Sequence, residues 1–414
     1  MGENVIDIKL EGVAHGGEAF GWHEGKITFV AYAIPGERVR AEVVQDKKNW
    51  ARAKLLEILE PSPDRVEPRC VHFGIGKCGG CHWQHISYRK QLELKREIVS
   101  EQLRRIGHIE DPPVEAVEQV GPPWNYRNNA RFSVTRDGSI GFRKGQSHEV
   151  VRIDECHLLH PRINELLRSF ELSWPNLRGV KIRHGVNTNE DMVVIEADGR
   201  EQPEISVDLP ISIVLQAGRD FVPLIGLPYI HEEVNGIRYR ISAGSFFQSN
   251  TPGAERLVKL VEEFLEPKPG QTVLDGYAGV GLFSLPLVQS SGQVISIEEN
   301  PWATEDLAQT AEEMGVDNLS LFEGPVEEVV RAMDQRVDAA VVDPPRSGMG
   351  KNVPGDLARL GVRNLVYVSC DPATMARDSG NLRSAGFELV RVRPLDMFPQ
   401  TFHIESVSLW QRRG

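Results

Sequence analysis

The feature that most limits the fold is a series of short, almost wholly apolar runs near the C-terminus. They cover residues 272–274, 293–297, 339–342 and 365–369, and stretches with helical periodicity separate them. Runs with little polar alternation are typical of strands buried on both faces. Strands that alternate with helices predict a parallel, doubly wound sheet. We therefore expect a doubly wound, Rossmann-like α/β domain over residues 246–414.

A chain of 414 residues is too long for one ordinary core, so further domains are expected. Residues 1–60 hold four β-rich runs with glycine turns, which predict a small β-barrel of the oligonucleotide-binding kind, although its fifth strand is not evident. Prolines 61, 63 and 68 then indicate a stiff linker. A helix over 86–106 and strand-like runs from 126 to 241 predict an α+β central domain over 61–245.

The run Val273-Leu274-Asp275-Gly276-Tyr277-Ala278-Gly279-Val280-Gly281 predicts a strand, a glycine turn and a helix. Ser284 takes the place of the third glycine of the dinucleotide fingerprint, which argues against a pyrophosphate ligand. Glu298 ends the next strand, where a carboxylate can accept hydrogen bonds from ribose hydroxyls or simply face solvent. Together they favour a nucleoside cofactor, and S-adenosylmethionine fits better than NAD because it has no phosphates.

Asp343 and Cys370 directly follow two further strands. Ligands bind beyond the carboxyl ends of parallel strands, so both side chains should face one crevice. Glu405, at the start of the last strand, could act there as a base. The alternatives are an inert buried thiol, a helix-capping aspartate and an exposed glutamate.

Five ordered motifs carry a resemblance to a known family. They are Phe247-Gln248-Ser249-Asn250, the glycine turn, Asp343-Pro-Pro-Arg346, Ser369-Cys370-Asp371-Pro372 and His403-Ile-Glu405. This set resembles the RNA uridine-C5 methyltransferases that act on 23S ribosomal RNA or on the tRNA T-loop. Residues 1–60 resemble the TRAM domain of the ribosomal members, and Cys78-Gly-Gly-Cys81-His-Trp-Gln-His85 resembles part of their central region.

The resemblance implies that Cys370 adds to C6 of uracil and that Glu405, ionised near its ordinary pKa, removes the C5 proton. It also implies cofactor contacts from Gln248, Tyr277, Glu298 and Asp343, although Asp343 could hold the uracil edge instead. Leu282 and Gly324-Pro325 stand where the family commonly has polar side chains, so two cofactor hydrogen bonds are expected to be missing.

The other four cysteines are Cys70, Cys78, Cys81 and Cys156. If Cys156 folds back on the cluster, they suit either zinc or an iron–sulfur cluster, and the spacing alone leaves the metal open. The resemblance implies a [4Fe–4S] cluster. Their C-x7-C-x2-C spacing departs from the pattern of radical enzymes.

A net charge of −12 argues against a nucleic-acid partner, but residues 121–152 carry six basic and two acidic residues. We therefore expect RNA as partner, 23S ribosomal RNA before tRNA, held by the barrel and this basic stretch. Two other functions stay open: an amino-group methyltransferase, which would not need Cys370, and a non-catalytic iron–sulfur RNA-binding protein. With neither a secretion signal nor an apolar run of membrane-spanning length, we expect a cytoplasmic monomer.

Overall fold

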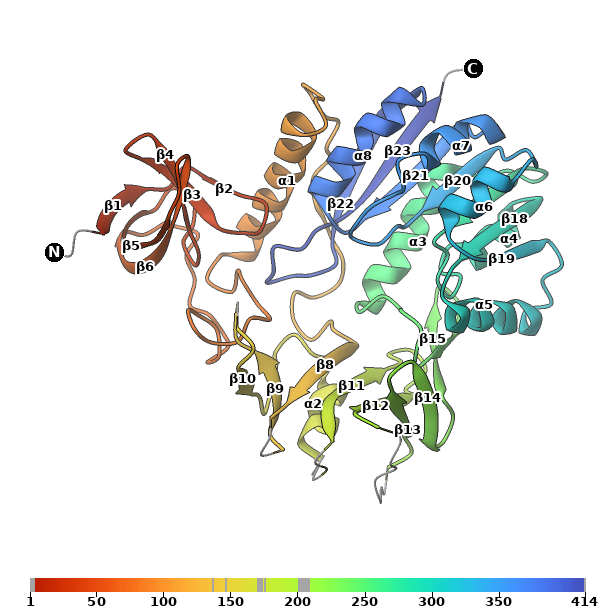
Figure 1. Cartoon of the computed structure of the whole chain (residues 1–414), viewed down its shortest axis with the longest axis horizontal. Coiled ribbons are helices and arrows are strands. Elements are labelled where there is room, and N and C mark those ends of the chain that lie inside the picture. The colour runs from red at the N-terminus through yellow and green to blue at the C-terminus, as the bar shows by residue number, and fades with distance from the viewer. Residues whose placement is uncertain are drawn as a thin grey trace.

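The computed structural model describes residues 4–412 except 136–137, 146, 170–173, 175 and 200–208. Its ribbon shows an N-terminal β-domain beside α1, a central sheet, and a larger C-terminal α/β domain (Figure 1). The expected architecture of barrel, α+β region and doubly wound domain is confirmed. The boundaries at 60/61 and 245/246 stay a prediction.

The N-terminal domain is a six-stranded sheet with the order β1-β5-β6-β4-β3-β2 around a small core that includes Ile8, Val30 and Val39. Its strands are β1 (Val5–Lys9), β2 (Gly12–Val13), β3 (Ala19–His23), β4 (Lys26–Val30), β5 (Arg38–Asp46) and β6 (Trp50–Glu60). The sequence pattern predicted β1, β4, β5 and β6 but did not reveal β2 and β3. In β3 the central position, Gly21, must be glycine because a Cβ there would lie 2.1 Å from the Lys9 carbonyl oxygen.

The central sheet has the order β10-β9-β8-β11-β12-β13-β14, and α2 (Pro161–Ser169) packs on it. Its strands are β8 (Asn129–Val134), β9 (Ile140–Arg143), β10 (Val150–Arg152), β11 (Leu177–His184), β12 (Asp191–Ala197), β13 (Ser212–Ala217) and β14 (Asp220–Ile225). A hairpin of β15 (Tyr229–Val234) and β16 (Ile237–Ser242) connects this sheet to the C-terminal domain, where β16 contacts α5 (Pro301–Glu313).

The C-terminal sheet has the order β19-β18-β17-β20-β21-β23-β22-β7. Its strands are β17 (Thr272–Gly276), β18 (Gln293–Glu298), β19 (Leu319–Glu323), β20 (Ala339–Val342), β21 (Asn364–Ser369), β22 (Phe387–Asp396) and β23 (Glu405–Arg412). The short strand β7 (Glu118–Gln119), from the central part of the chain, completes the sheet. The first five pair in parallel, and β23 runs antiparallel between β21 and β22. All four apolar runs that predicted buried strands lie in this sheet.

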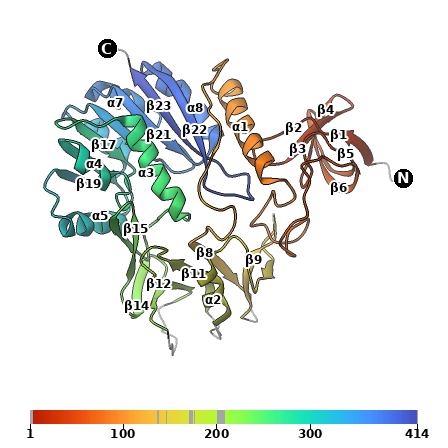
Figure 2. The ribbon, with the colours of Figure 1, turned by 180° about the vertical axis from the view of Figure 1, so that it is seen from behind.

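Helices cover both faces of the C-terminal sheet, as a doubly wound fold requires. One face packs against α3 (Thr251–Leu265), α4 (Ser284–Ser290) and α5, and α3 is seen across it in Figure 2. The other face packs against α1 (Tyr88–Arg105), α6 (Val326–Ala332), α7 (Val353–Leu360) and α8 (Pro372–Ser384). Alternating residues divide the two cores, since Val273 faces the first and Leu274 the second.

Candidate active site

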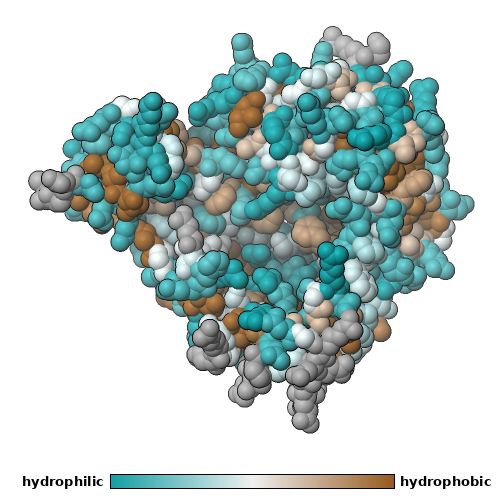
Figure 3. Space-filling view, in the orientation of Figure 1, coloured by the Kyte–Doolittle hydropathy of each residue, from teal (hydrophilic) through white to brown (hydrophobic). Residues whose placement is uncertain are grey.

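The carboxyl ends of the parallel strands open into one cavity of about 590 Å³, which we call the catalytic crevice. Every side chain expected at the active site lines it: Gln248, Tyr277, Glu298, Asp343, Cys370 and Glu405. In the space-filling view the molecular surface is hollowed between the domains (Figure 3). Strands far apart in the sequence thus deliver the predicted residues to one place.

Glu298 anchors the glycine turn at one end of the crevice. One of its carboxylate oxygens accepts a hydrogen bond of 2.7 Å from the backbone N–H of Gly279, and the other accepts one of 2.7 Å from Asn300. Gly279 and Gly281 both have positive φ, +56° and +87°. The turn is therefore fixed against a carboxylate that still has lone pairs for a ligand's hydroxyl groups.

Ser284, the residue that replaces the third glycine, closes a buried polar network beneath the turn. Its hydroxyl donates to a carboxylate oxygen of Asp275 at 2.5 Å and accepts from Ser296 at 2.7 Å. Burial raises the pKa of Asp275 to about 7. A serine at this position thus serves the folding of the turn.

Tyr277 lies in the left-handed region with φ of +65°, and its hydroxyl donates to Glu327 at 2.7 Å. Glu327 also accepts a hydrogen bond from the backbone N–H of Gly350 at 3.2 Å. The wall of the crevice beside the glycine turn is therefore held by a carboxylate from α6 that the motifs did not reveal.

Cys370 and Glu405 meet at the other end of the crevice because of strand register. Ser369 of β21 pairs with Ser406 of β23, so the next residue along β21 and the preceding residue of β23 lie at the same end of the two strands. Paired residues in antiparallel strands have Cα atoms about 4.5–5.5 Å apart. The fold thus brings a thiol and a carboxyl group together from positions 35 residues apart in the sequence.

Burial shifts the protonation of the acidic groups in the crevice. Glu405 is 3% exposed, one of its oxygens has no hydrogen-bond partner, and burial beside Asp343 raises its pKa well above the ordinary value. The expectation that Glu405 titrates near its ordinary pKa is therefore wrong. Burial also raises the pKa of Asp343 to about 7 and that of the Cys370 thiol to about 11.

Two further crevice residues were not predicted: Phe246 directly precedes one of the family motifs, and Arg346 ends another. Phe246 is 70% exposed and lines the crevice directly before Phe247 and Gln248. Arg346 ends the Asp-Pro-Pro-Arg motif, lowers the pKa of Cys370 and lies 3.2 Å from a ring nitrogen of His403. Their nearness to the motifs could have drawn attention to both residues. The motifs do not indicate, however, which neighbouring side chains enter the crevice.

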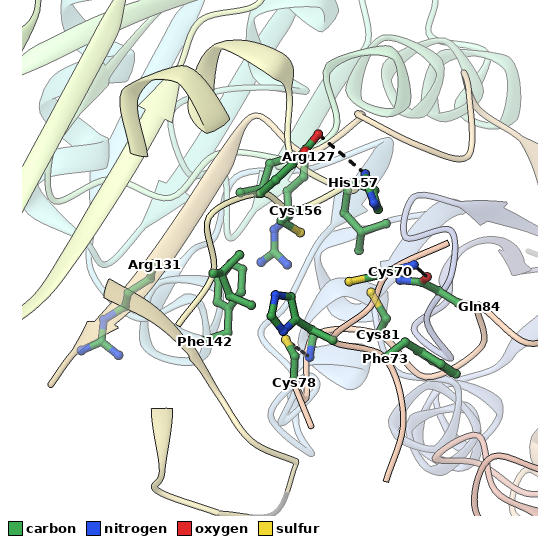
Figure 4. A pocket seen from close by; sticks show the side chains of 16 residues that line it. Cys70, Phe73, Cys78, Cys81, Gln84, Arg127, Arg131, Phe142, Cys156 and His157 are labelled. Carbon is green, nitrogen blue, oxygen red and sulfur yellow. Dashed lines mark hydrogen bonds and ion pairs between the residues drawn. The ribbon is translucent and has the colours of Figure 1, made fainter. Parts of the chain in front are cut away.

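The four remaining cysteines line a second cavity of about 190 Å³ (Figure 4). Cys70, Cys78 and Cys81 come from the loop before α1, and Cys156 comes from the segment between β10 and α2. Burial, together with the nearby Cys156 and Cys70, raises the pKa of Cys78 to about 11. In the part of the chain that the structure describes, no three His, Cys, Asp or Glu side chains form a group that could hold a metal ion. The expected cluster therefore stays a prediction.

A doubly wound domain whose crevice joins a glycine turn to a strand-end carboxylate defines the class of proteins that bind a nucleoside-containing cofactor. A family model described as tRNA (Uracil-5-)-methyltransferase matches residues 225–413, and a TRAM domain model matches residues 4–56. The chain is 33% identical to an uncharacterized RNA methyltransferase of Thermosynechococcus vestitus, over 98% of this chain and 97% of that protein. It is 31% identical to the 23S rRNA (uracil(1939)-C(5))-methyltransferase of Shewanella sediminis, over 98% and 96%.

Among solved structures, the chain is similar to the tRNA (uracil-54, C5)-methyltransferase of Pyrococcus abyssi in complex with S-adenosyl-L-homocysteine. The TM-score is 0.78 at 28% identity, over 98% of this chain and 100% of that one. The chain belongs to the RNA uracil-C5 methyltransferase family. It is an S-adenosylmethionine-dependent enzyme with an N-terminal TRAM domain, which excludes both the amino-group methyltransferase and the non-catalytic RNA-binding protein. No helix among the described residues is long and apolar enough to cross a bilayer.

Proposed function

We propose that this enzyme methylates C5 of a uridine in 23S ribosomal RNA through a covalent adduct between Cys370 and C6 of the base. The observation that carries the proposal is that Cys370, Glu405 and Asp343 line the same crevice as the glycine turn and Glu298. The similarity to the ribosomal enzyme of Shewanella sediminis supports 23S ribosomal RNA as the substrate. The similarity to the archaeal tRNA enzyme makes the tRNA T-loop the second candidate. We expect a cytoplasmic monomer.

In this mechanism the Cys370 thiol releases its proton to solvent water and the thiolate forms a bond to C6, while the C5–C6 electron pair moves toward the O4 carbonyl. S-adenosylmethionine would supply the methyl group as a sulfonium: C5 of the enolate would bond to the methyl carbon as the methyl–sulfur bond breaks, which would release S-adenosylhomocysteine. Glu405 then takes the proton from C5. The electron pair of the C5–H bond re-forms the C5–C6 double bond, and the bond between sulfur and C6 breaks to release the Cys370 thiolate. Arg346 favours the thiolate, because it lowers the pKa of Cys370.

The carboxyl groups of the crevice have separate roles in this proposal. Glu298 would accept hydrogen bonds from the ribose hydroxyls of the cofactor, and Tyr277 and Gln248 would line its binding site. Asp343 would lie between cofactor and uracil, where a protonated carboxyl could donate to the base. A positive sulfonium nearby would favour the ionised form of Glu405, whose pKa burial raises.

The decisive experiment is incubation with methyl donor and 5-fluorouridine-substituted transcripts of 23S ribosomal RNA or of tRNA. Fluorine at C5 cannot leave as a proton, so a working site becomes permanently linked to the RNA. We expect a linked species on a denaturing gel with the 23S transcript, and no such species with Cys370→Ala. Glu405→Gln should reduce turnover on ordinary RNA by about 10²–10⁴-fold, as expected for loss of a general base. Linkage with tRNA alone would move the substrate to the T-loop, and linkage with neither would refute the proposed chemistry.

We also propose a [4Fe–4S] cluster on Cys70, Cys78, Cys81 and Cys156. Four cysteine thiolates are the ligand set of such a cluster, and these four side chains line one cavity. The cluster would join the loop before α1 to the segment before α2. Anaerobically purified protein should contain iron and sulfide, and Cys156→Ser should lose both. Wild-type protein that is free of iron yet folds and methylates normally would contradict this assignment.

A further inference from the structure

His403 lines the catalytic crevice but takes no part in the chemistry proposed for Cys370 and Glu405. Its ring nitrogen Nδ1 lies 3.2 Å from a guanidinium nitrogen of Arg346. A guanidinium can only donate hydrogen bonds, so Nδ1 is the acceptor and the proton of the neutral ring lies on Nε2. The imidazole is therefore a fixed acceptor for the cation at the end of the Asp-Pro-Pro-Arg motif.

The surroundings of His403 keep its imidazole neutral. Burial, followed by the charge of Arg346 and the neighbouring His82, lowers its pKa to about 3. Lys95 and Arg127 act in the same direction. At neutral pH the ring therefore retains the lone pair that accepts from Arg346.

Aromatic neighbours enclose the imidazole of His403. Its ring centroid lies 4.5 Å from that of Phe402 and 6.0 Å from that of Phe398, and His82 lies edge-on to it at 6.0 Å. The backbone N–H of His403 donates to the hydroxyl of Thr401 at 3.2 Å. Both the ring and its backbone are thus held in place.

The segment between β22 and β23, which carries His403, is anchored on α1 and on the loop before it. Gln400, whose φ is +67°, donates through its backbone N–H to the buried side chain of Gln91 at 2.9 Å. The side-chain oxygen of Gln400 accepts from the same amide at 3.0 Å. Its carbonyl accepts from the N–H groups of His82 and Trp83, each at 3.0 Å. An acceptor on such a segment is preorganised.

Arg346, by contrast, is exposed, and a long side chain of this kind can adopt many rotamers. Its location matters for the thiol. Burial, with Glu405 and Asp343, raises the pKa of Cys370 to about 11, whereas the charge and the side-chain hydrogen bond of Arg346 act in the opposite direction. A guanidinium that moved away from the thiol would lose this effect.

We propose that His403 is a positioning residue whose Nδ1 holds the guanidinium of Arg346 beside Cys370 and thereby favours the attacking thiolate. The inference rests on the proposed function, since it takes Cys370 to be the nucleophile. In this arrangement His403 acts on the chemistry only through Arg346.

The test measures how fast iodoacetamide alkylates Cys370 in the full-length protein without RNA, by mass spectrometry of the peptide that contains this cysteine. At about pH 8, well below the pKa of the thiol, the rate is proportional to the thiolate fraction. His403→Phe keeps an aromatic ring but removes the acceptor. It should slow alkylation by about three- to tenfold, equivalent to a rise of roughly 0.5–1 in the pKa of Cys370. His403→Asn, whose amide oxygen can replace Nδ1 as acceptor, should retain most of the wild-type rate.

A double-mutant cycle separates this role from simple packing. Arg346→Ala should slow alkylation at least as much as His403→Phe does, and adding His403→Phe to Arg346→Ala should slow it no further, because the two side chains act as one unit. His148→Phe, which changes an exposed histidine between β9 and β10, should react as the wild type does. Thermal melting and S-adenosylhomocysteine affinity verify that each variant is folded.

A wild-type alkylation rate in folded His403→Phe would overturn the inference. An equal loss in His403→Asn would also overturn it, because the ring would then matter for packing alone. Additive losses in the double variant would mean that His403 acts independently of Arg346, which contradicts the inference as well. Failure of the proposed function looks different: alkylation of Cys370 then depends on His403 as expected, but 5-fluorouridine RNA forms no linked species.

Discussion

At the scale of single residues, the crevice and the turn beside it place three carboxyl groups in surroundings that raise their pKa values. Asp275 is fully buried with one oxygen unpaired, and Asp343 and Glu405 also have raised pKa values. The sequence indicated which side chains approach one another, because strand ends and family motifs identify them. It could not indicate their protonation, since the shift depends on how completely the surrounding helices exclude water.

Asp275 should make the stability of the unliganded protein fall as the pH rises. The carboxyl titrates near 3.9 when unfolded and near 7 in the fold, so between these values the folded state holds a proton that the unfolded state has lost. Its contribution to stability is fully present below about pH 4 and is lost as the pH rises to about 7. Between pH 5 and pH 8 the free energy of unfolding should fall in both proteins. The fall should be roughly 1–3 kcal/mol smaller in Asp275→Asn than in the wild type.

Urea unfolding at the two pH values measures this difference. Asp317→Asn, which changes an exposed carboxyl group, serves as the control and should follow the wild type. If Asp275→Asn shows the same pH dependence as the wild type, Asp275 is ionised throughout this range and the burial argument fails.

At the scale of elements, the glycine turn between β17 and α4 depends on one position more than on the others. A Cβ at Gly281 would lie 2.3 Å from the Leu307 side chain, and its φ of +87° is unfavourable for other residues. Gly281→Ala should displace the turn and weaken S-adenosylhomocysteine binding by roughly tenfold, the equivalent of about 1.4 kcal/mol of strain. Isothermal titration calorimetry measures the change.

Gly355 in α7 provides a matched control because a Cβ there would meet nothing within 4 Å. Gly355→Ala should leave ligand affinity unchanged and stabilise the protein by about 0.5 kcal/mol, as expected for alanine in a helix. Equal ligand affinity in the two variants would show that the turn tolerates a side chain.

Strands could be predicted from the sequence where burial on both faces requires a continuous run of apolar residues. The apolar run at residues 339–342 coincides with β20, which is buried along its whole length. By contrast, β22 has charged side chains at Glu388, Arg391 and Arg393, and β3 has a glycine at its centre, so neither reads as a strand. In both cases the strand is determined by its partner: β22 pairs with β23, and β3 accommodates Lys9 against Gly21.

At the scale of the whole molecule, the domains are joined by contacts that no local pattern encodes. The helix α1 packs against α8, β7 extends the C-terminal sheet, and Lys95 of α1 forms a buried ion pair of 2.6 Å with Asp396. The N-terminal domain touches the catalytic domain through His15 and touches the central domain through Gly17, whose carbonyl accepts a hydrogen bond from Trp83. Residues before 121 thus contact the catalytic domain both through α1 and β7 and through the N-terminal domain.

The contact between His15 and Asp371 fixes the N-terminal domain beside the catalytic cysteine that we propose. It lowers the pKa of Asp371, whose carboxylate also caps α8 by accepting from the Thr374 N–H at 2.9 Å. Because partly exposed ion pairs contribute at most about 1 kcal/mol, His15→Ala should change global stability little. It should instead loosen the orientation of the domain and raise the KM for RNA by roughly three- to tenfold with kcat nearly unchanged.

Steady-state methylation of a 23S transcript measures KM and kcat separately. Calorimetry with S-adenosylhomocysteine checks that the cofactor site is intact. His23→Ala changes a histidine of the same domain, at the end of β3 where it pairs with Lys26 of β4, and should retain wild-type kinetics. A fall in kcat at saturating RNA with unchanged KM would mean that His15 acts through Asp371 on the chemistry at Cys370, because a domain that only delivers RNA ceases to matter once RNA is bound.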